Sequence, residues 1–374
     1  MQIGFDAKRA FLNNTGLGNY SRETINILSN YYPENSYFLY TPKIIKNKRL
    51  DFIKERKNIE ICKPEGIINS SIKSYWRTKN IISDLLMKKI NIYHGLSHEI
   101  PLCIEETKIK SIVTIHDLIF LRYPKLYSLI DRKIYYYKIK SACRRADKII
   151  AISEQTKKDI IQFLNIDPQK IKVVYQSCNN IFQSNINIQE KKSILLKYNI
   201  DHQYLLYVGS IERRKNLLTL LKTIKKLKNQ YLVVIGNGGS YKKKCLKYIQ
   251  EEKLTHRVKI LSGLKIKEIA AFYQSAQIMI YPSKFEGFGL PIIEALFSKT
   301  PIITSKGSCF NEAGGPKTKY INPMSVNDIY NTILEIQNSL EIQKEMKEEG
   351  YNYVQKFTHK KVAKRLMEVY EELQ

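Results

Sequence analysis

The chain has 374 residues, more than a single hydrophobic core comfortably holds, so two domains are expected. Its composition, with 43% apolar and 26% charged residues, is ordinary for a globular protein. No uninterrupted apolar run of about 18 residues occurs, which argues against a transmembrane helix. The net charge of +27 favours anionic partners such as nucleic acid, acidic lipids or phosphorylated substrates, although a lysine-rich source proteome explains it equally well.

The cysteines and the first residues indicate a cytoplasmic protein. Residues 1–6 (MQIGFD) have the pattern of a first strand and lack the basic start and long apolar stretch of a signal peptide. The six cysteines show no CxxC pair and no cluster with histidine: Cys62, Cys103, Cys143, Cys178, Cys245 and Cys309. We therefore expect reduced thiols, no metal site and no bound cofactor.

Strand and helix patterns alternate through the first half of the chain. Short apolar runs predict strands at 2–6, 37–40, 59–62, 91–94, 111–116, 148–152 and 172–175. Helical patterns lie between several of them, at 20–29, 74–88, 129–145 and 154–164.

The alternation then restarts. Strands are predicted at 204–208, 231–235, 258–261, 277–281 and 301–304, and helices around 216–228, 241–253 and 266–275. Near-continuous apolar strands such as Tyr231–Ile235 are typical of parallel sheets covered on both faces, so the pattern predicts an α/β protein. The tail has helical patterns at 326–351 and 359–373 and no further strand.

The polar stretch 176–192 separates the two series and is the expected domain junction. We predict two doubly wound, Rossmann-like domains that face each other across a cleft, the first over 1–180 and the second over 193–355. A final helix over 356–374 would pack on the surface or cross back to the first domain. Ligands of such sheets bind outside the carboxyl ends of the strands.

Residues 281–295 (YPSKFEGFGLPIIEA) carry the most specific chemical pattern. Glu286 and Glu294 flank a glycine-rich turn between a predicted strand and a helix expected from Pro291. Glycines let the backbone approach a ligand, and the N–H groups at a helix start attract phosphate. Acidic residues there can also simply complement the helix dipole. The whole segment nevertheless favours a sugar nucleotide, which has an anionic middle and hydroxyl-rich ends.

Five segments together resemble a known family. They are NTGLGNY at 14–20, TIHD at 114–117, YVGSIERRKN at 207–216, FEGFGLPIIEA at 285–295 and EAGGP at 312–316. In this order they resemble family 4 retaining glycosyltransferases of the GT-B fold, in particular bacterial enzymes that build surface polysaccharides. Residues 175–179 (YQSCN) depart from the family, which usually has an Asn-Gly turn there, and this affects the interdomain hinge rather than the chemistry.

The resemblance implies transfer of a sugar from a nucleoside diphosphate, with retained anomeric configuration and no metal. It implies that Glu286 binds the donor sugar, that Glu294 binds the ribose hydroxyls and that His116 lies near the reacting sugar. The other donor-binding positions it implies are the amides of Gly287, Phe288, Gly289 and Leu290 along the sugar and diphosphate, Arg214 and Lys215 at the diphosphate, Leu264 at the nucleobase, and Gly16 and Gly18 at the phosphates.

Several of these positions have a plainer explanation. Gly16 and Gly18 fit a tight turn, because they lack the third glycine and the acidic partner of a dinucleotide fingerprint. His116 follows a buried-looking strand, so a structural histidine is an equal alternative. Arg-Lys pairs are usually solvated surface, but Arg214-Lys215 directly follows a strand and a glycine, where cations would stabilise a departing phosphate. With no obvious carboxylate nucleophile, we expect front-side attack, in which the phosphate accepts the acceptor's proton.

The acceptor is expected on the N-terminal domain, which the resemblance makes the acceptor half. Two basic segments with apolar residues, 74–89 and 131–148, can lie on an anionic membrane or can face their own sheet as ordinary amphipathic helices. We favour a saccharide or lipid-linked saccharide acceptor and a peripheral position on the inner face of the plasma membrane. IHDLI at 115–119 resembles mannosyl- or related transferases that act on GDP-sugars, and this resemblance weakly favours a GDP-mannose-like donor.

Two other classes of function remain open. A sugar-nucleotide hydrolase or isomerase of the same fold would keep the donor site. A nucleic-acid-binding protein would explain the charge, but the chain has no aromatic RNA motif, zinc finger or clustered basic region, so no nucleic-acid partner is expected.

Overall fold

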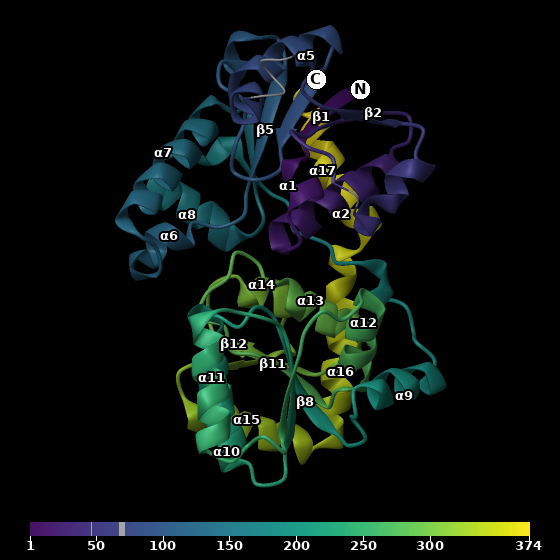
Figure 1. Ribbon diagram of the computed structural model, residues 1–374, viewed down its shortest axis with the longest axis vertical. Helices are drawn as coiled ribbons and strands as arrows, with labels where there is room; N and C mark the ends of the chain where they lie inside the picture. Colours follow the sequence, from purple (N-terminus) through teal and green to yellow (C-terminus); the bar gives the residue numbers. More distant parts are fainter. Residues whose placement is uncertain (46, 67–71) are drawn as a thin grey trace. The chain divides into compact units, whose positions relative to one another are not determined.

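The computed structural model describes residues 1–45, 47–66 and 72–374. It consists of two compact units, one formed by residues 1–177 with 359–374 and the other by residues 178–358. Each unit is a parallel sheet flanked by helices (Figure 1), which confirms the predicted pair of doubly wound, Rossmann-like domains.

The first unit has a seven-stranded sheet in the order β3-β2-β1-β4-β5-β6-β7. Its strands lie close to the predicted positions: β1 Gln2–Asp6, β2 Ser36–Tyr40, β3 Ile59–Cys62, β4 Ile92–Gly95, β5 Lys110–Ile115, β6 Lys148–Ala151 and β7 Ile171–Val173. The chain order reverses between β1 and β4, which makes the carboxyl ends of these two strands the topological switch point of the sheet.

The helices of the first unit include several that the sequence pattern predicts. Those described are α1 Lys8–Leu12, α2 Gly16–Tyr31, α4 Lys73–Tyr75, α5 Ile81–Met87, α6 Ile119–Arg122, α7 Leu129–Arg145, α8 Glu154–Leu164 and α17 His359–Glu371. Short 3₁₀ turns cover Lys48–Glu55, Ile104–Glu106, Pro124–Leu126 and Pro168–Lys170. The helix predicted over 74–88 is interrupted by a π-helical turn at Trp76–Asn80. Arg77 in that turn pairs with Asp6 at the end of β1.

The last helix belongs to the first unit although it follows the whole second unit in sequence. Figure 1 shows α17, in yellow, beside the purple α2. The Tyr370 hydroxyl lies 2.6 Å from Nδ1 of His94 in β4, and His359 Nε2 lies 2.8 Å from Glu23 Oε1 of α2. Buried apolar residues such as Leu366 complete the contact.

The second unit has a six-stranded sheet in the order β10-β9-β8-β11-β12-β13. Its strands are β8 Tyr204–Val208, β9 Tyr231–Ile235, β10 Val258–Leu261, β11 Ile278–Tyr281, β12 Ile302–Ser305 and β13 Lys319–Ile321. Its helices are α9 Ile188–Lys197, α10 Leu217–Lys226, α11 Ser240–Glu251, α12 Ile266–Ser275, α13 Leu290–Phe297, α14 Phe310–Gly314, α15 Val326–Gln337 and α16 Leu340–Val354, with 3₁₀ turns at Asn180–Phe182, Arg213–Lys215 and Gln355–Phe357. The sequence pattern missed β13, which is only three residues long.

The domain boundary differs from the predicted one. The polar stretch 176–192 is the expected junction, but its residues 178–192 belong to the second unit. The Phe182 ring packs edge-on against Tyr273 at 5.6 Å, and the Ile186 amide donates to Gln274 Oε1 at 3.1 Å. Phe182 and Ile186 are both buried, and these few apolar anchors attach an otherwise polar segment to α12.

Candidate functional site

Two loops meet at the switch point of the second sheet. One loop follows β8 and contains residues 209–215, and the other follows β11 and runs to Gly289. β8 and β11 are neighbours, and the chain order reverses between them. The loops are joined directly, because the Lys284 amide donates to the Arg214 carbonyl at 2.9 Å. Ligands of doubly wound sheets bind at this position.

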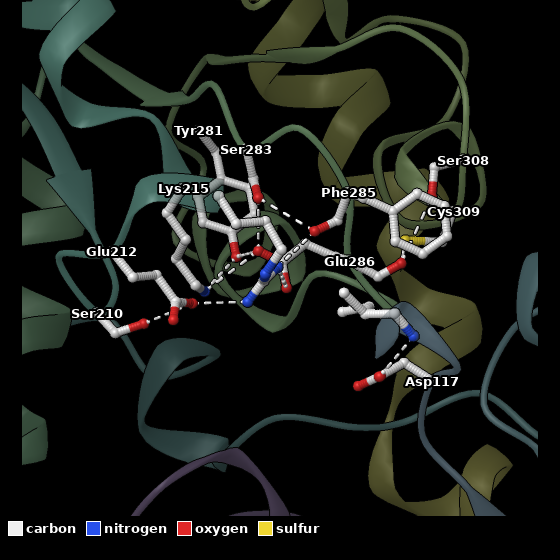
Figure 2. Close-up of polar contacts among 12 residues, drawn as sticks. Asp117, Ser210, Glu212, Lys215, Tyr281, Ser283, Phe285, Glu286, Ser308 and Cys309 are labelled. Carbon is white, nitrogen blue, oxygen red and sulfur yellow. Dashed lines mark hydrogen bonds and ion pairs between the residues drawn. The ribbon is translucent and has the colours of Figure 1, made fainter. Parts of the chain in front are cut away.

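Glu286 lies at the centre of a charged cluster between these loops (Figure 2). Its Oε2 is 2.6 Å from Arg214 Nη1, and its Oε1 is 3.3 Å from Lys215 Nζ. The hydroxyls of Tyr281 and Ser283 donate to Oε1 at 2.8 and 2.7 Å. These donors occupy most of the positions at which a carboxylate can accept a hydrogen bond. The resemblance places Glu286 at the sugar and the two cations at the diphosphate of one donor, and in the structure these three side chains pair with each other.

The cluster keeps Glu286 ionised. Burial alone would raise its pKa, but the charges of Lys215 and Arg214 and the hydrogen bonds from Arg214 and Ser283 lower it to about 2. Arg214 also donates to the Phe285 carbonyl and, at 2.7 Å, to Glu212 Oε1. Burial opposes the charge of Arg214, but the nearby carboxylates outweigh it and raise its pKa.

Unusual backbone conformations place these groups. Gly209 has φ +148°, and a Cβ there would come within 3.3 Å of the Lys215 side chain, so glycine leaves room for the lysine. Asn216, in a left-handed conformation, ends the Arg213–Lys215 turn and precedes α10. Gly289, with φ +107°, precedes α13, which begins at Leu290 rather than at the predicted Pro291. The strand-to-helix turn therefore requires glycine on geometric grounds.

Glu294 occupies a different environment on α13. The Tyr273 hydroxyl donates to its Oε2 at 2.9 Å. Burial raises the pKa of Glu294 to about 7, because the hydrogen bond from Tyr273 and the charge of Lys215 only partly compensate. Unlike Glu286, Glu294 therefore titrates near neutral pH.

The other predicted positions of the turn follow Glu286 along the chain. Gly287 and Phe288 are buried, and the Phe288 ring packs edge-on against Phe357 at 5.3 Å. This aromatic contact ties the turn to the core. Leu290 is partly exposed at the start of α13. Leu264 is also partly exposed, but it follows β10 at the edge of the sheet.

The two predicted glycines of the first unit differ in their surroundings. Gly16 is the first residue of α2, with open space where a Cβ would stand. A Cβ on Gly18 would lie 1.9 Å from the Asn13 carbonyl oxygen, so packing alone requires glycine. The Gly18 amide donates to Asn13 Oδ1 at 3.2 Å. The tight-turn explanation therefore accounts for Gly18, and phosphate contact stays a prediction for both.

His116 is buried after β5. Its Nε2 donates to the Leu96 carbonyl at 2.9 Å, which fixes the proton on this nitrogen. Tyr20 and His98 pack against the ring. Burial, aided by His98, lowers the pKa of His116 to about 3, so the imidazole is neutral near pH 7 and cannot act as a general acid from its protonated form. The structural alternative explains these contacts, and a role near the reacting sugar stays a prediction.

Three polar residues that hydrogen-bond to the two glutamates are not among the predicted site residues. Tyr281 and Ser283 precede Glu286 in the same segment, and their hydroxyls were a readable signal. Tyr273 lies in α12, where nothing in the pattern connects it with Glu294. In the three described ranges, no group of three His, Cys, Asp or Glu side chains is arranged to hold a metal ion.

Comparison with protein families covers most of the chain in two consecutive parts. A model described as Glycosyltransferase Family 4 matches residues 59–179, and one described as Glycosyl transferases group 1 matches residues 188–353. The chain belongs to the family 4 glycosyltransferases. The second match contains both loops of the cluster and both glutamates, so the site described above lies in the part of the chain that this model covers.

Curated relatives of this glycosyltransferase include two from enteric bacteria. O-antigen chain mannosyltransferase RfbU of Salmonella typhimurium is 28% identical over 253 residues, which cover 67% of this chain and 66% of the relative. O-antigen chain mannosyltransferase B of Escherichia coli is 26% identical over 251 residues, which cover 65% of this chain and 64% of that protein. The chain thus matches slightly less than two thirds of either relative.

A solved structure of similar fold matches the whole glycosyltransferase chain. The Anabaena protein Alr3699/HepE, solved in complex with UDP-glucose, aligns with a TM-score of 0.79 and 13% identity, covering 100% of both chains. At this identity the likeness concerns the fold alone, and it supports the GT-B class.

Proposed function

We propose that this protein transfers a hexose from a nucleoside-diphosphate sugar to a growing, lipid-linked saccharide in cell-surface polysaccharide biosynthesis. GDP-mannose is the favoured donor, the anomeric configuration is retained, and no metal ion takes part. The reaction would occur in the cytoplasm, at the inner face of the plasma membrane.

The observation that carries this proposal is the cluster of Glu286, Arg214 and Lys215 beside the start of α13. Two cations and the amides of a glycine-rich turn suit a diphosphate, because each can stabilise negative charge on its oxygens. Glu286 stays ionised and suits hydroxyl donors. When a diphosphate shares the charge of Arg214 and Lys215, Glu286 would become available to the hydroxyls of the donor sugar.

The names of the relatives support the donor and the pathway. Two of them are called O-antigen chain mannosyltransferases, and the Anabaena protein of similar fold binds UDP-glucose. The mannosyltransferases favour a mannose donor and a surface saccharide, whereas UDP-glucose leaves a uridine nucleotide as the first competing donor.

The proposed mechanism is front-side displacement. The acceptor hydroxyl oxygen bonds to the anomeric carbon while the bond from that carbon to the phosphate oxygen breaks on the same face. The acceptor proton passes to the departing phosphate, so no protein base is required. Arg214 and Lys215 stabilise the charge that develops on the diphosphate, and Glu286 orients the sugar.

Donor binding and turnover test the proposal separately. We expect GDP-mannose to raise the melting temperature more than UDP-glucose or an ADP-sugar, because a ligand stabilises the fold in proportion to RT ln(1 + [L]/Kd). Nucleoside diphosphate should then be released only when a lipid-linked saccharide is present. NMR should show the donor's anomeric configuration in the product, and activity should survive a chelator.

Arg214→Gln should lose both the thermal shift and turnover, whereas Arg213→Gln provides a matched control in the same turn. Release of nucleoside diphosphate at the same rate without any acceptor would instead assign the protein to the hydrolases. Absence of a shift with every nucleotide sugar would contradict the proposed donor site.

A further inference from the structure

Helix α7 has two apolar faces. Ile139 and Cys143 are buried, and Tyr136 packs against the same core at helical spacing. Ile130, Ile134 and Tyr137 form a second stripe at i, i+4 and i+7, and all three are exposed. At about 100° per residue, the two stripes point in nearly opposite directions. A helix that packs on only one element needs only one apolar face.

The second stripe is strongly exposed. Ile130 is 72% exposed, and Tyr137 is 68% exposed. We call Ile130, Ile134 and Tyr137 the α7 outer face. Single exposed apolar residues are ordinary, but a contiguous group of large ones marks a surface that binds a partner or a membrane.

Basic residues border the α7 outer face. On the helical wheel, Lys133 and Arg144 lie on one side of the stripe and Lys138 on the other. Lys138 Nζ lies 3.7 Å from Glu99 Oε1, whereas within residues 1–45, 47–66 and 72–374 no carboxylate forms an ion pair with Lys133 or Arg144. Asp131 is the one acidic residue of the helix, and it is held at the N-terminus by a hydrogen bond from the Ser128 hydroxyl at 2.7 Å.

We propose that the α7 outer face binds an anionic lipid bilayer, with its apolar side chains inserted among the headgroups and Lys133, Lys138 and Arg144 on the lipid phosphates. Charge selects this occupant, because a second copy of the chain would bring like charges together, whereas anionic lipids neutralise them. Tyrosine suits the boundary, since its ring is apolar and its hydroxyl remains hydrated. No helix of the described residues has the length and apolar character needed to cross a membrane, so the contact would be peripheral.

This surface rests on the proposed position at the inner face of the plasma membrane and assigns the contact to α7, but it does not depend on which donor is used. The test is flotation of the full chain with vesicles of equal parts phosphatidylglycerol and phosphatidylcholine at low salt. We expect binding to anionic vesicles that weakens in high salt and on pure phosphatidylcholine. Ile130→Gln combined with Ile134→Gln should lower the vesicle-bound fraction roughly tenfold or more, and Lys133→Gln combined with Arg144→Gln should lower it severalfold.

Leu340→Gln is the matched control, because Leu340 is 82% exposed on α16 of the other unit. Binding of this control should equal that of the wild type. Equal loss in the control and in the Ile130/Ile134 variant, or no vesicle binding by the wild type at low salt, would overturn the proposal. Sedimentation without vesicles that shows a dimer dissociated by the Ile130/Ile134 changes would assign the face to a second copy instead.

Unchanged melting temperatures show that the variants fold. A nucleotide-sugar thermal shift measured without vesicles distinguishes failure of the donor site from failure of this surface. We expect the Ile130/Ile134 variant to keep the wild-type shift.

Discussion

Glu286 and Glu294 belong to one turn-and-helix segment, yet the pKa of one carboxyl group is lowered and that of the other is raised. Glu286 is buried among cations and hydroxyl donors, which lower its pKa to about 2. Glu294 accepts a hydrogen bond from one tyrosine hydroxyl, and burial raises its pKa to about 7. Burial favours the neutral acid in both cases, so the nearby positive charge decides the difference.

Replacing Glu286 with Gln should destabilise the protein at neutral pH. The change leaves Arg214 and Lys215 buried without their carboxylate, which costs about 3 to 5 kcal/mol. Because the folded pKa of Glu286 lies below the ordinary value of 4.5, its stabilisation is complete above that value and is lost as pH falls toward 2. In denaturant unfolding, the difference between wild type and variant should therefore shrink as pH falls below about 5.

Glu212→Gln is the control for that experiment. Glu212 also contacts Arg214, but its side chain is 46% exposed, so its loss should cost less than about 1 kcal/mol. Equal costs for Glu212→Gln and Glu286→Gln would contradict the central position of Glu286.

Glu294 should give the opposite pH dependence. Its raised pKa means that the folded protein binds a proton that the unfolded chain releases between about pH 4.5 and 7. The stability of the wild type relative to Glu294→Gln should therefore fall over this interval, by at most about 3 kcal/mol, and stay constant above about pH 8. Denaturant unfolding midpoints of both proteins at pH 5, 6, 7 and 8 test this. A pH-independent difference would show that Glu294 ionises normally.

At the scale of elements, strong local sequence patterns were enough to predict most strands of the two sheets. The apolar run Tyr231–Ile235 is strand β9 with the predicted bounds, and helix α7 also matches its predicted range. Prediction failed where distant contacts decide the structure. The π-turn at Trp76–Asn80 interrupts a good helical pattern, and there Arg77 reaches Asp6 and Glu99 far along the chain.

The candidate site, too, was predictable from local sequence only in part. The segment 281–295 shows its glycines, its glutamates and the hydroxyls of Tyr281 and Ser283 within a few residues, so most of the Glu286 environment was readable. The pairing of Glu286 with Arg214 was not, because it depends on two loops that only the strand order brings together. For His116, a strand-end position did not reveal the hydrogen bond to Leu96.

The start of α2 provides a matched pair of glycines. Gly18→Ala should destabilise the protein by several kcal/mol, because a Cβ 1.9 Å from the Asn13 oxygen forces backbone to move. Gly16→Ala meets open space at the first position of the helix and should be neutral or stabilising by up to about 1 kcal/mol. Urea unfolding of both variants measures the difference. If Gly18→Ala kept full stability but lost nucleotide-sugar binding, phosphate contact rather than packing would explain this glycine.

At the scale of the whole molecule, the last helix of the chain completes the first unit. Helix α17 packs on α2, and Tyr370 bonds to His94, whose other ring nitrogen lies 2.7 Å from the Thr114 hydroxyl. Burial, with a contribution from His116, lowers the pKa of His94 to about 3, so this link joins neutral groups near pH 7. An amphipathic pattern predicts that α17 is a helix, but it does not say which unit the helix covers.

Deleting residues 359–374 should therefore unfold the first unit and leave the second intact. The deletion exposes the surfaces covered by Leu366, Met367 and Tyr370, and each such side chain contributes about 1.5 to 3 kcal/mol. Together with the other buried residues of α17, this is comparable with the whole stability of a typical domain, about 5 to 15 kcal/mol. Hydrogen exchange should show loss of protection in β1 and β4 and retained protection in β8 and β11.

The milder control is Tyr370→Phe, which removes one buried hydroxyl and leaves His94 Nδ1 without its partner, at a cost of about 1 to 3 kcal/mol. That variant should remain folded, with faster exchange confined to the first unit. Full protection of β1 and β4 in the truncated chain would mean that α17 only covers a surface that is already stable. Equal loss of protection in β8 and β11 would mean that the two units unfold together, and the C-terminal helix would then stabilise the whole chain rather than the unit it completes.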